Sequence, residues 1–368
     1  MTVQRRIRSS QSSALILGNR VARAAIDGMT QFVLLCSVPS YIWQLTDTPQ
    51  TDWPHWVVEC GGGMFHTPAG VLVGAPEGEV VYAHLVARGE IRGIAVGVRS
   101  RCRLSWRVRH AHFPALPALA PGIDVGDALE ALREVLWKTG IAEVEIGSYD
   151  ATYVPADGIE PRLEYVVPLP QTGDVTAAWG TTHRRHVRRG DRDGWTTRLL
   201  LGDEARTTIL GIQQSTAERA ASLHRGFAPA QVTGWVSLVT ATLPLPDWGL
   251  AVVGAYRDTT LLAALLLGWA GQRAFYLIGG STPDGYQCGA APWLHAQAMT
   301  MLAQRGIQCY NLGGTPMDAA EASSLAHGLY RFKTGFGVSP VERRGMRWLL
   351  RPGHAQLHRM LSRFRRPG

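Results

Sequence analysis

The sequence predicts an α/β protein made of two similar domains with mixed sheets, and three observations support this fold class. The chain has 368 residues, which is enough for two domains with separate cores. Residues 136–147 read LWKTGIAEVEIG and residues 302–313 read LAQRGIQCYNLG, so Leu, Gly, Ile, an aliphatic residue and a final Gly recur at the same offsets. Strand-forming runs precede both segments. The duplicated order of hairpin, strand, helix and strand predicts antiparallel and parallel neighbours in one sheet.

In the first half, strand-forming runs at residues 80–86 and 91–98 flank a glycine-centred turn and predict a hairpin. Residues 126–139 predict a helix, because their apolar side chains recur at helical spacing. Gly140 ends this helix, since glycine readily takes the left-handed conformation of a helix cap. A short strand follows at once.

The second half repeats this order. Runs at residues 251–256 and 261–267 predict another hairpin, and residues 273–278 predict a third strand. Pro292 occupies a favoured first helical position, and apolar residues at helical spacing follow it. Gly306 ends this helix as Gly140 ends the first.

A further helix is predicted between the halves. Asp174 is a candidate N-cap for a helix that runs to Arg189, and Gly190 is its stop. This helix contains the basic run THRRHVRR at residues 182–189.

Four segments follow from these elements. We expect an N-terminal extension, helical or disordered, at residues 1–44 and a first domain at residues 45–172. A second domain spans residues 173–345, and a basic helix closes the chain at residues 346–368.

Composition limits the classes of function. The formal net charge of +8 favours a polyanionic partner, such as nucleic acid, anionic lipid or a phosphorylated substrate. The five cysteines are scattered and the twelve histidines show no metal-binding spacing, so we expect no disulfide framework, no metal and a reducing, cytoplasmic location. The longest apolar runs are shorter than the roughly 18 residues of a membrane span.

Lysine use singles out one position. The chain has 37 Lys and Arg residues, and only Lys138 and Lys333 are lysines. Lys138 lies at a predicted helix end, where a cation is ordinary. Lys333 lies in GLYRFKTGFG at residues 328–337, where a compact ammonium on a flexible stem can reach a tight polar site. We interpret Lys333 as functional.

Two motifs in the second half resemble a known signature. Residues 310–314 read YNLGG at a strand end, and residues 328–337 match almost completely a segment of the Fem family (FemABX-like) of aminoacyl-tRNA-dependent transferases. Asn311 stands where that family usually has aspartate. A weaker resemblance extends from about residue 45 to 345 and includes the basic run. The resemblance implies two fused GNAT-like (acyl-CoA N-acyltransferase-like) domains, which agrees with the repeat.

The resemblance also implies an activity and its residues. The implied reaction joins an aminoacyl group from tRNA to an amine of a peptidoglycan precursor, or of a peptide or nucleoside natural product, without a cofactor. Lys333 and Phe332 are the implied catalytic residues: an ammonium stabilises the oxyanion of ester aminolysis, and an aromatic neighbour can hold that ammonium. Candidate substrate-binding residues are Tyr330, Arg331, Gly313 and Gly314. Candidate tRNA-binding residues are Arg184, Arg185, Arg188 and Arg189.

Several alternatives stay open. An acyl-CoA-dependent GNAT enzyme shares the domain, but residues 279–290 lack the glycine spacing of a pyrophosphate loop. A non-catalytic homologue that binds a cell-wall precursor or nucleic acid is a third class. The helical arm that some Fem relatives insert is expected to be absent, because glycines and prolines break residues 203–248. The tail at residues 343–366 has basic and apolar sides, which fit tRNA, anionic lipid or plain solvation.

Overall fold

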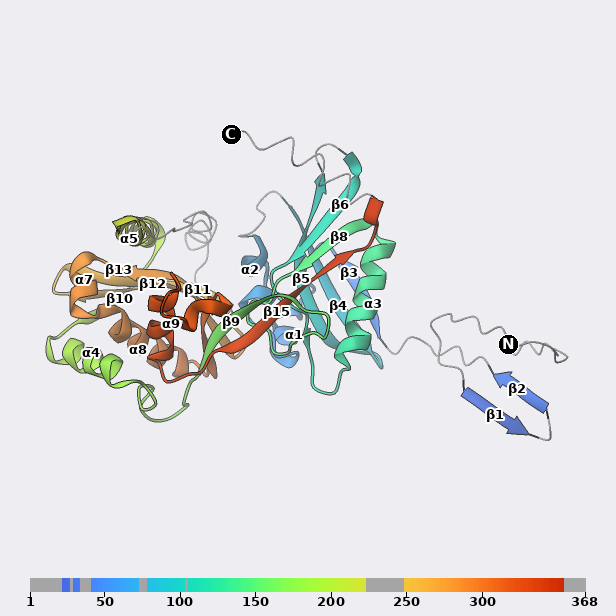
Figure 1. Cartoon of the computed structure of the whole chain (residues 1–368), viewed down its shortest axis with the longest axis horizontal. Coiled ribbons are helices and arrows are strands. Elements are labelled where there is room, and N and C mark those ends of the chain that lie inside the picture. The colour runs from blue at the N-terminus through green and yellow to red at the C-terminus, as the bar shows by residue number, and fades with distance from the viewer. Residues whose placement is uncertain are drawn as a thin grey trace.

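One mixed β-sheet runs through the protein and carries two lobes (Figure 1). The computed structural model describes residues 22–26, 29–33, 41–72, 78–102, 105–222 and 248–353. Within these residues, the sheet has 13 strands in the order β10-β11-β12-β13-β14-β9-β15-β8-β6-β5-β4-β3, with β7 paired to β5. The lobes therefore share hydrogen-bonded strands at their junction.

The first lobe contains the N-terminal half of the sheet. Its strands are β3 (Ile42–Thr46), β4 (Glu79–Ala87), β5 (Glu90–Cys102), β6 (Ser105–Phe113), β7 (Ala118–Leu119) and β8 (Ile141–Ile146). Its helices are α1 (Trp53–Glu59), η1 (Met64–His66), α2 (Pro68–Leu72) and α3 (Val125–Lys138). Helix α3 buries Leu132 and Leu136 against the sheet, as its apolar spacing predicts.

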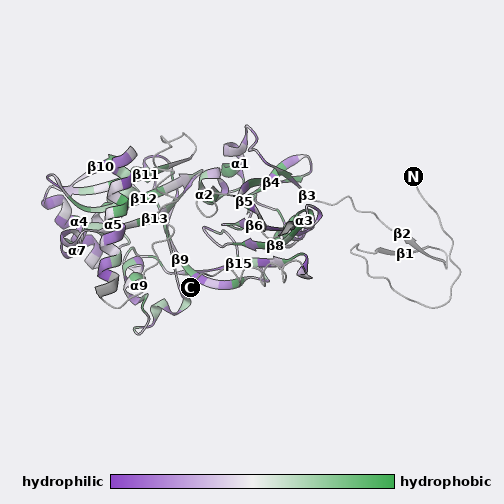
Figure 2. Cartoon of the chain, turned by 90° about the horizontal axis from the view of Figure 1, so that it is seen from above, coloured by the Kyte–Doolittle hydropathy of each residue, from purple (hydrophilic) through white to green (hydrophobic). Residues whose placement is uncertain are grey.

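The second lobe contains the rest of the sheet. Its strands are β9 (Ile159–Pro168), β10 (Thr196–Leu200), β11 (Trp248–Arg257), β12 (Thr260–Ala270), β13 (Arg273–Ser281), β14 (Cys309–Thr315) and β15 (Val341–Leu349). Its helices are α4 (Thr181–Arg192), α5 (Gly202–Ser222), α7 (Pro283–Cys288), α8 (Ala290–Ala303), η3 (Met317–Ala320) and α9 (His327–Thr334). Helices α5 and α8 both contact β12, which is apolar along almost its whole length for this reason (Figure 2).

The predicted repeat is confirmed in the topology. Strands β4, β5 and β6 pair antiparallel, and β6 then pairs parallel with β8 across helix α3. Strands β11, β12, β13 and β14 repeat this pattern across helix α8. Gly140 and Gly306 end the two helices with φ of +82° and +78°, and open space surrounds both positions. Backbone conformation alone therefore favours glycine there.

The two halves of the chain exchange their end strands: β9, at the end of the first half, joins the second lobe, and β15, near the end of the second half, reaches the first lobe. Strand β9 pairs with β14 of the second lobe, and β15 pairs with both β9 and β8. Figure 1 shows β15, in red, running from the second lobe into the first. The expected C-terminal helix is wrong for residues 346–349, because Met346 and Trp348 are buried in the core of the first lobe while Arg347 and Leu349 are exposed. That alternation has the two-residue period of a strand; residues 354–368 lie outside the described residues.

Two further expectations need correction. Helix α4 begins after Gly180, and Asp174 instead accepts hydrogen bonds from the backbone N and Oγ1 of Thr176 in a separate turn. Gly190 lies inside this helix and does not end it; the reason for glycine is that a side chain there would overlap Trp293. In the N-terminal extension, the described segments β1 (Ala22–Ile26) and β2 (Met29–Val33) are strands and not helix.

The segment expected to lack a helical arm is described only in part. Helix α5 covers residues 202–222 and packs on β12 and β13. Residues 223–247 lie outside the described residues. None of the helices in the described ranges is both long enough and apolar enough to cross a membrane.

The strand exchange predicts unequal effects of truncation. Ending the chain at residue 340 removes β15, and with it the buried Trp348, whose loss alone costs roughly 3–5 kcal/mol. We expect this protein to lose the cooperative unfolding of its first lobe. A matched control that ends at residue 353 keeps every described strand and should melt within a few degrees of the full chain. Equal melting temperatures for both truncations, measured by circular dichroism, would contradict the role of β15.

Candidate functional site

The second lobe opens where strands β13 and β14 part. Their parallel pairing covers only Arg273–Phe275 against Cys309–Asn311. On its other side β14 pairs with β9 over Cys309–Asn311; a bulge interrupts that pairing after Asn311, and it resumes at Gly314. In the first lobe, the equivalent strands β6 and β8 stay paired to Phe113 and Ile146. Of these two strand pairs, only the one in the second lobe therefore leaves a gap where another group can reach the sheet.

Lys333 reaches β14 just beyond the point where its pairing with β13 ends. Helix α9 carries it, and the residue is only 4% exposed. Its Nζ donates a hydrogen bond to the carbonyl oxygen of Gly314 at 2.9 Å and lies 5.5 Å from the centre of the Tyr165 ring. The ammonium is thus fixed by one backbone acceptor and one aromatic face.

The surroundings of Lys333 lower its pKa to about 7. The main cause is burial, which disfavours the charged form, and the nearby Arg162 guanidinium adds to the effect. Glu164 acts in the opposite direction. Near neutral pH, Lys333 therefore exchanges between an ammonium that stabilises negative charge and an amine that accepts a proton.

The two glycines of β14 have different reasons to be glycine. Gly313 has φ of +73°, and its N–H donates to Asn311 Oδ1 at 2.8 Å. A side chain at Gly313 would meet Lys333 Nζ only at an ordinary contact distance of 3.6 Å, so backbone conformation is the constraint. At Gly314, a side chain would overlap the Arg162 guanidinium. Together they shape the bulge that presents a carbonyl to Lys333.

Asn311 ties this bulge to two buried carboxylates. Its Nδ2 donates to Asp150 Oδ1 at 3.0 Å and to Glu164 Oε2 at 2.9 Å. Arg273 binds Asp150 through two hydrogen bonds of 2.8 and 2.6 Å. Burial raises the pKa of Glu164, while Arg162 lowers it. An amide suits position 311 because it gives a donor to two acceptors without a third negative charge.

Phe332 lies elsewhere than the cation–π expectation placed it. Its ring packs against His183, His295 and Phe336, with centroids 5.1 to 5.7 Å apart. Among the described residues, the aromatic ring beside Lys333 is that of Tyr165. Successive residues of a helix point in directions about 100° apart, so Phe332 and Lys333 leave α9 in different directions.

The other expected substrate-binding residues divide by exposure. Tyr330 is partly buried, and its ring meets Tyr165 edge-on at 6.4 Å. Arg331 is exposed on the outer side of α9. Tyr330 therefore packs against Tyr165, the ring beside Lys333, whereas Arg331 faces solvent.

The arginine helix α4 is joined to the Lys333 segment. His183 Nε2 donates to the carbonyl oxygen of Phe332 at 2.9 Å. Arg185 and Arg188 are exposed, and neither forms an ion pair with any residue that the structure describes. Arg189 pairs with Asp193 at 3.3 Å, and Arg184 is partly buried. Arg185 and Arg188 are thus the two members of the predicted set with open guanidinium groups.

Strand β9 contributes residues to this site that were not predicted from the sequence. Arg162, Glu164 and Tyr165 lie on this strand, and Asp150 lies in the loop before it. The sequence did carry a sign of these buried charges, because Arg162 and Glu164 lie in the otherwise mainly apolar run RLEYVVPL at residues 162–169. Charges in a buried strand mark paired polar groups.

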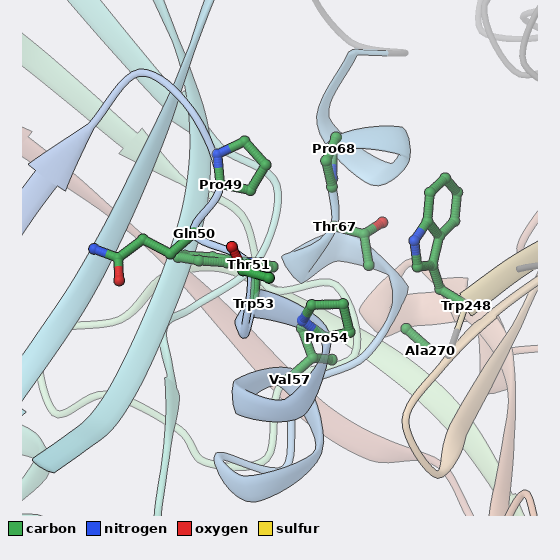
Figure 3. Close-up of a pocket in the computed structure, with 10 residues that line it drawn as sticks. All are labelled: Pro49, Gln50, Thr51, Trp53, Pro54, Val57, Thr67, Pro68, Trp248 and Ala270. Carbon is green, nitrogen blue, oxygen red and sulfur yellow. The ribbon is translucent and has the colours of Figure 1, made fainter. Parts of the chain in front are cut away.

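A separate cavity of about 300 Å³ lies between α1 and the ends of β11 and β12 (Figure 3). Its lining is mainly proline, tryptophan and small apolar residues: Pro49, Gln50, Thr51, Trp53, Pro54, Val57, Thr67, Pro68, Trp248 and Ala270. It contains none of the residues around Lys333 and no ionisable side chain. The described residues also contain no group of three or more His, Cys, Asp or Glu that could hold a metal.

Comparisons with known proteins identify the fold. Residues 181–334 match the family model described as Acetyltransferase (GNAT) domain. The crystal structure of FemX aligns with a TM-score of 0.67 and 14% identity, covering 85% of this chain and 99% of that chain. A conserved protein of unknown function from Bacteroides thetaiotaomicron aligns with a TM-score of 0.51 and 10% identity over 83% and 99% of the two chains. No curated protein matches the sequence.

These matches confirm the predicted fold class. The protein is a mixed α/β molecule with GNAT-like lobes, and its second lobe carries the acetyltransferase-type domain. The gap at Lys333 lies within that domain, since both β14 and α9 fall inside the matched residues. The chain therefore has the fold of an acyltransferase.

The lowered pKa of Lys333 predicts how stability depends on pH. The folded-state pKa of about 7 lies below the unfolded-state value of roughly 10.4, so the unfolded chain binds one more proton between these limits. Raising the pH in this window therefore stabilises the folded state. Relative to Lys333→Met, the unfolding free energy of the natural protein should rise by about 1.4 kcal/mol per pH unit. Urea unfolding at three pH values between 7.5 and 9.5 measures this slope, and parallel curves for the two proteins would show that the lysine titrates normally.

Proposed function

We propose that the protein transfers an aminoacyl group from charged tRNA to an amine of a peptide or peptidoglycan-precursor acceptor in the cytoplasm. The observation that carries this proposal is the buried Lys333, which reaches β14 just beyond the end of its pairing with β13 and lies in a segment that resembles the Fem signature. The similarity of the fold to that of FemX supports it.

The chemistry fits the groups around Lys333. The acceptor amine attacks the ester carbonyl, a C–N bond forms, and the carbonyl oxygen becomes an oxyanion. The C–O bond then breaks, and the ribose hydroxyl of tRNA leaves with a proton while the amine loses one. The Lys333 ammonium in its dry setting stabilises the oxyanion, and it needs little reorganisation because Gly314 and Tyr165 already hold it.

The site favours an aminoacyl-tRNA donor over acyl-CoA. GNAT enzymes bind the CoA pyrophosphate at a helix N-terminus after the splayed strand. Here α7 occupies that connection, and a side chain at Gly289, just before α8, would overlap His186 of α4. Arg189 Nη1 also reaches the carbonyl oxygen of Cys288 at 3.5 Å. The entrance to the α8 N-terminus is thus packed against α4, whose exposed arginines suit phosphates of nucleic acid.

Acyl-CoA-dependent N-acyltransfer is the second candidate. The match of residues 181–334 to an acetyltransferase domain favours it. A homologue without turnover is the less favoured class, because burying a lysine is costly and a binding protein has no need of it.

The donor can be tested directly. The purified protein is incubated with a pool of charged tRNAs and muropeptide precursors, and products are identified by mass spectrometry. We expect an aminoacylated product that ribonuclease pretreatment abolishes and that added acetyl-CoA does not increase. Stoichiometric coenzyme A binding by calorimetry, together with turnover of an acyl-CoA, would establish the second candidate instead.

Lys333 variants test the mechanism. Lys333→Ala should lower turnover roughly 100- to 1,000-fold, the usual loss for one oxyanion-stabilising donor. Lys333→Arg should also fail, because a planar guanidinium cannot occupy the position of the ammonium beside Gly314. Phe332→Leu should be milder, since it changes packing and not the ammonium contact. Turnover is compared with melting temperature for each variant; near-normal turnover of the arginine variant would reduce Lys333 to a structural role.

A further inference from the structure

Two arginines face each other across the junction of the lobes. In the antiparallel pairing of β9 with β15, Arg162 lies directly opposite Arg343. Directly opposed side chains share one face of a sheet, and like charges in this arrangement repel. Both side chains are mostly buried, with 24% and 13% of their surface exposed. A negatively charged group bound between the two guanidinium groups would relieve this repulsion.

The protein's own carboxylates satisfy the pair only in part. Arg162 Nη2 lies 3.1 Å from Glu164 Oε1, whereas Arg343 Nε lies 3.9 Å from Glu164 Oε2. Among the described residues, Arg343 Nε is buried and has no hydrogen-bond partner. Glu164 already accepts from Asn311, and Asp150 is taken up by Arg273 and Asn311. The cluster thus holds three guanidinium groups and Lys333 against two carboxylates.

The arginine pair is also preorganised beside the proposed reaction centre. The guanidinium of Arg162 stacks on the Tyr149 ring, 4.4 Å from its centre, which fixes the plane of its donors. The same guanidinium lies against Gly314, whose carbonyl binds Lys333. A group bound by the pair therefore sits next to the ammonium that we assign to catalysis.

We propose that Arg162 and Arg343 form a subsite for a single oxyanion, a carboxylate or a phosphate, on the substrate that reaches Lys333. The guanidinium forks match the two oxygens of such a group, and partial burial strengthens the charge-assisted hydrogen bonds. Two mostly buried arginine side chains suit one small anion, in contrast to the exposed Arg185 and Arg188 of α4. This assignment rests on the proposed function only for the identity of the substrate.

Direct binding tests the subsite on the full-length protein without any turnover. The probes are inorganic pyrophosphate, N-acetyl-dialanine with its free carboxylate, and the amide of the same peptide, each titrated by calorimetry. We expect one of the two anions to bind. If it is the free peptide, the amide of that peptide should bind at least tenfold more weakly. Binding of pyrophosphate alone identifies phosphate as the source, and binding of the free peptide alone identifies carboxylate.

Matched variants locate the binding. Arg343→Gln should weaken binding of the probe roughly 10- to 100-fold, the usual effect of losing a charged hydrogen-bonding group. The control is Arg344→Gln, which removes the same charge from the next residue of β15, where Arg344 pairs with Glu342 at 2.5 Å. This control should bind as the natural protein does. Arg343→Lys keeps the charge without the fork and serves if the glutamine variant does not fold; it too should weaken binding.

Three outcomes would overturn the subsite: no anion binds the natural protein, Arg343 variants bind normally, or Arg344→Gln is equally impaired. Lys333→Ala separates this proposal from the proposed function. If that variant still binds the probe but has lost turnover, both proposals stand. If it retains turnover while Arg343→Gln loses binding, the proposed mechanism fails and the anion subsite remains.

Discussion

The amide of Asn311 holds the site together because it ties β14 to Glu164 of β9 and to Asp150 in the loop before β9. It donates to Asp150 and Glu164 from the first half of the chain, and its carbonyl accepts the N–H of Gly313 in the second half. Buried carboxylates that lost this donor would be left with unsatisfied oxygens, which is costly in a dry interior. The bulge of β14, and with it the acceptor for Lys333, therefore depends on a polar network and not on apolar packing alone.

Strand exchange makes this network possible. Strand β9 leaves the first half to pair with β14, and β15 returns from the second half to pair with β9 and β8. Arg162, Glu164 and Tyr165 thereby reach a gap formed by strands more than a hundred residues later. The lobes cannot separate without breaking these ladders, so we infer that the charged groups around Lys333 keep their positions. A fixed set of charges is what electrostatic catalysis requires.

Local signals in the sequence were enough to predict the lobes but not their junction. Glycine caps, hairpin turns and helical spacing are read within a dozen residues, so α3, α8 and the paired strands agree with expectation. The partners of β9 and β15 are set by pairing over long sequence distances, which leaves no local mark. The basic and apolar residues of the tail suggested a helix at residues 346–368, although burial of Met346 and Trp348 fixes residues 346–349 in a strand. In the same way, Tyr165 and not Phe332 supports Lys333, because the direction of a side chain on α9 depends on where that helix docks.

Asn311 shows how a departure from a signature can preserve a site. In the Fem motif that residues 310–314 resemble, aspartate is usual at this position. The N–H of Gly313 needs an acceptor here, and Oδ1 of Asn311 supplies it as a carboxylate oxygen would. Here the neighbouring positions already hold two carboxylates, Asp150 and Glu164, within 3.0 Å of the Asn311 amide nitrogen. A third carboxylate would repel both, and one of the three would have to bind a proton. Asparagine keeps the shape of aspartate and supplies a donor in place of the charge, so it fits a junction that already holds two acidic side chains.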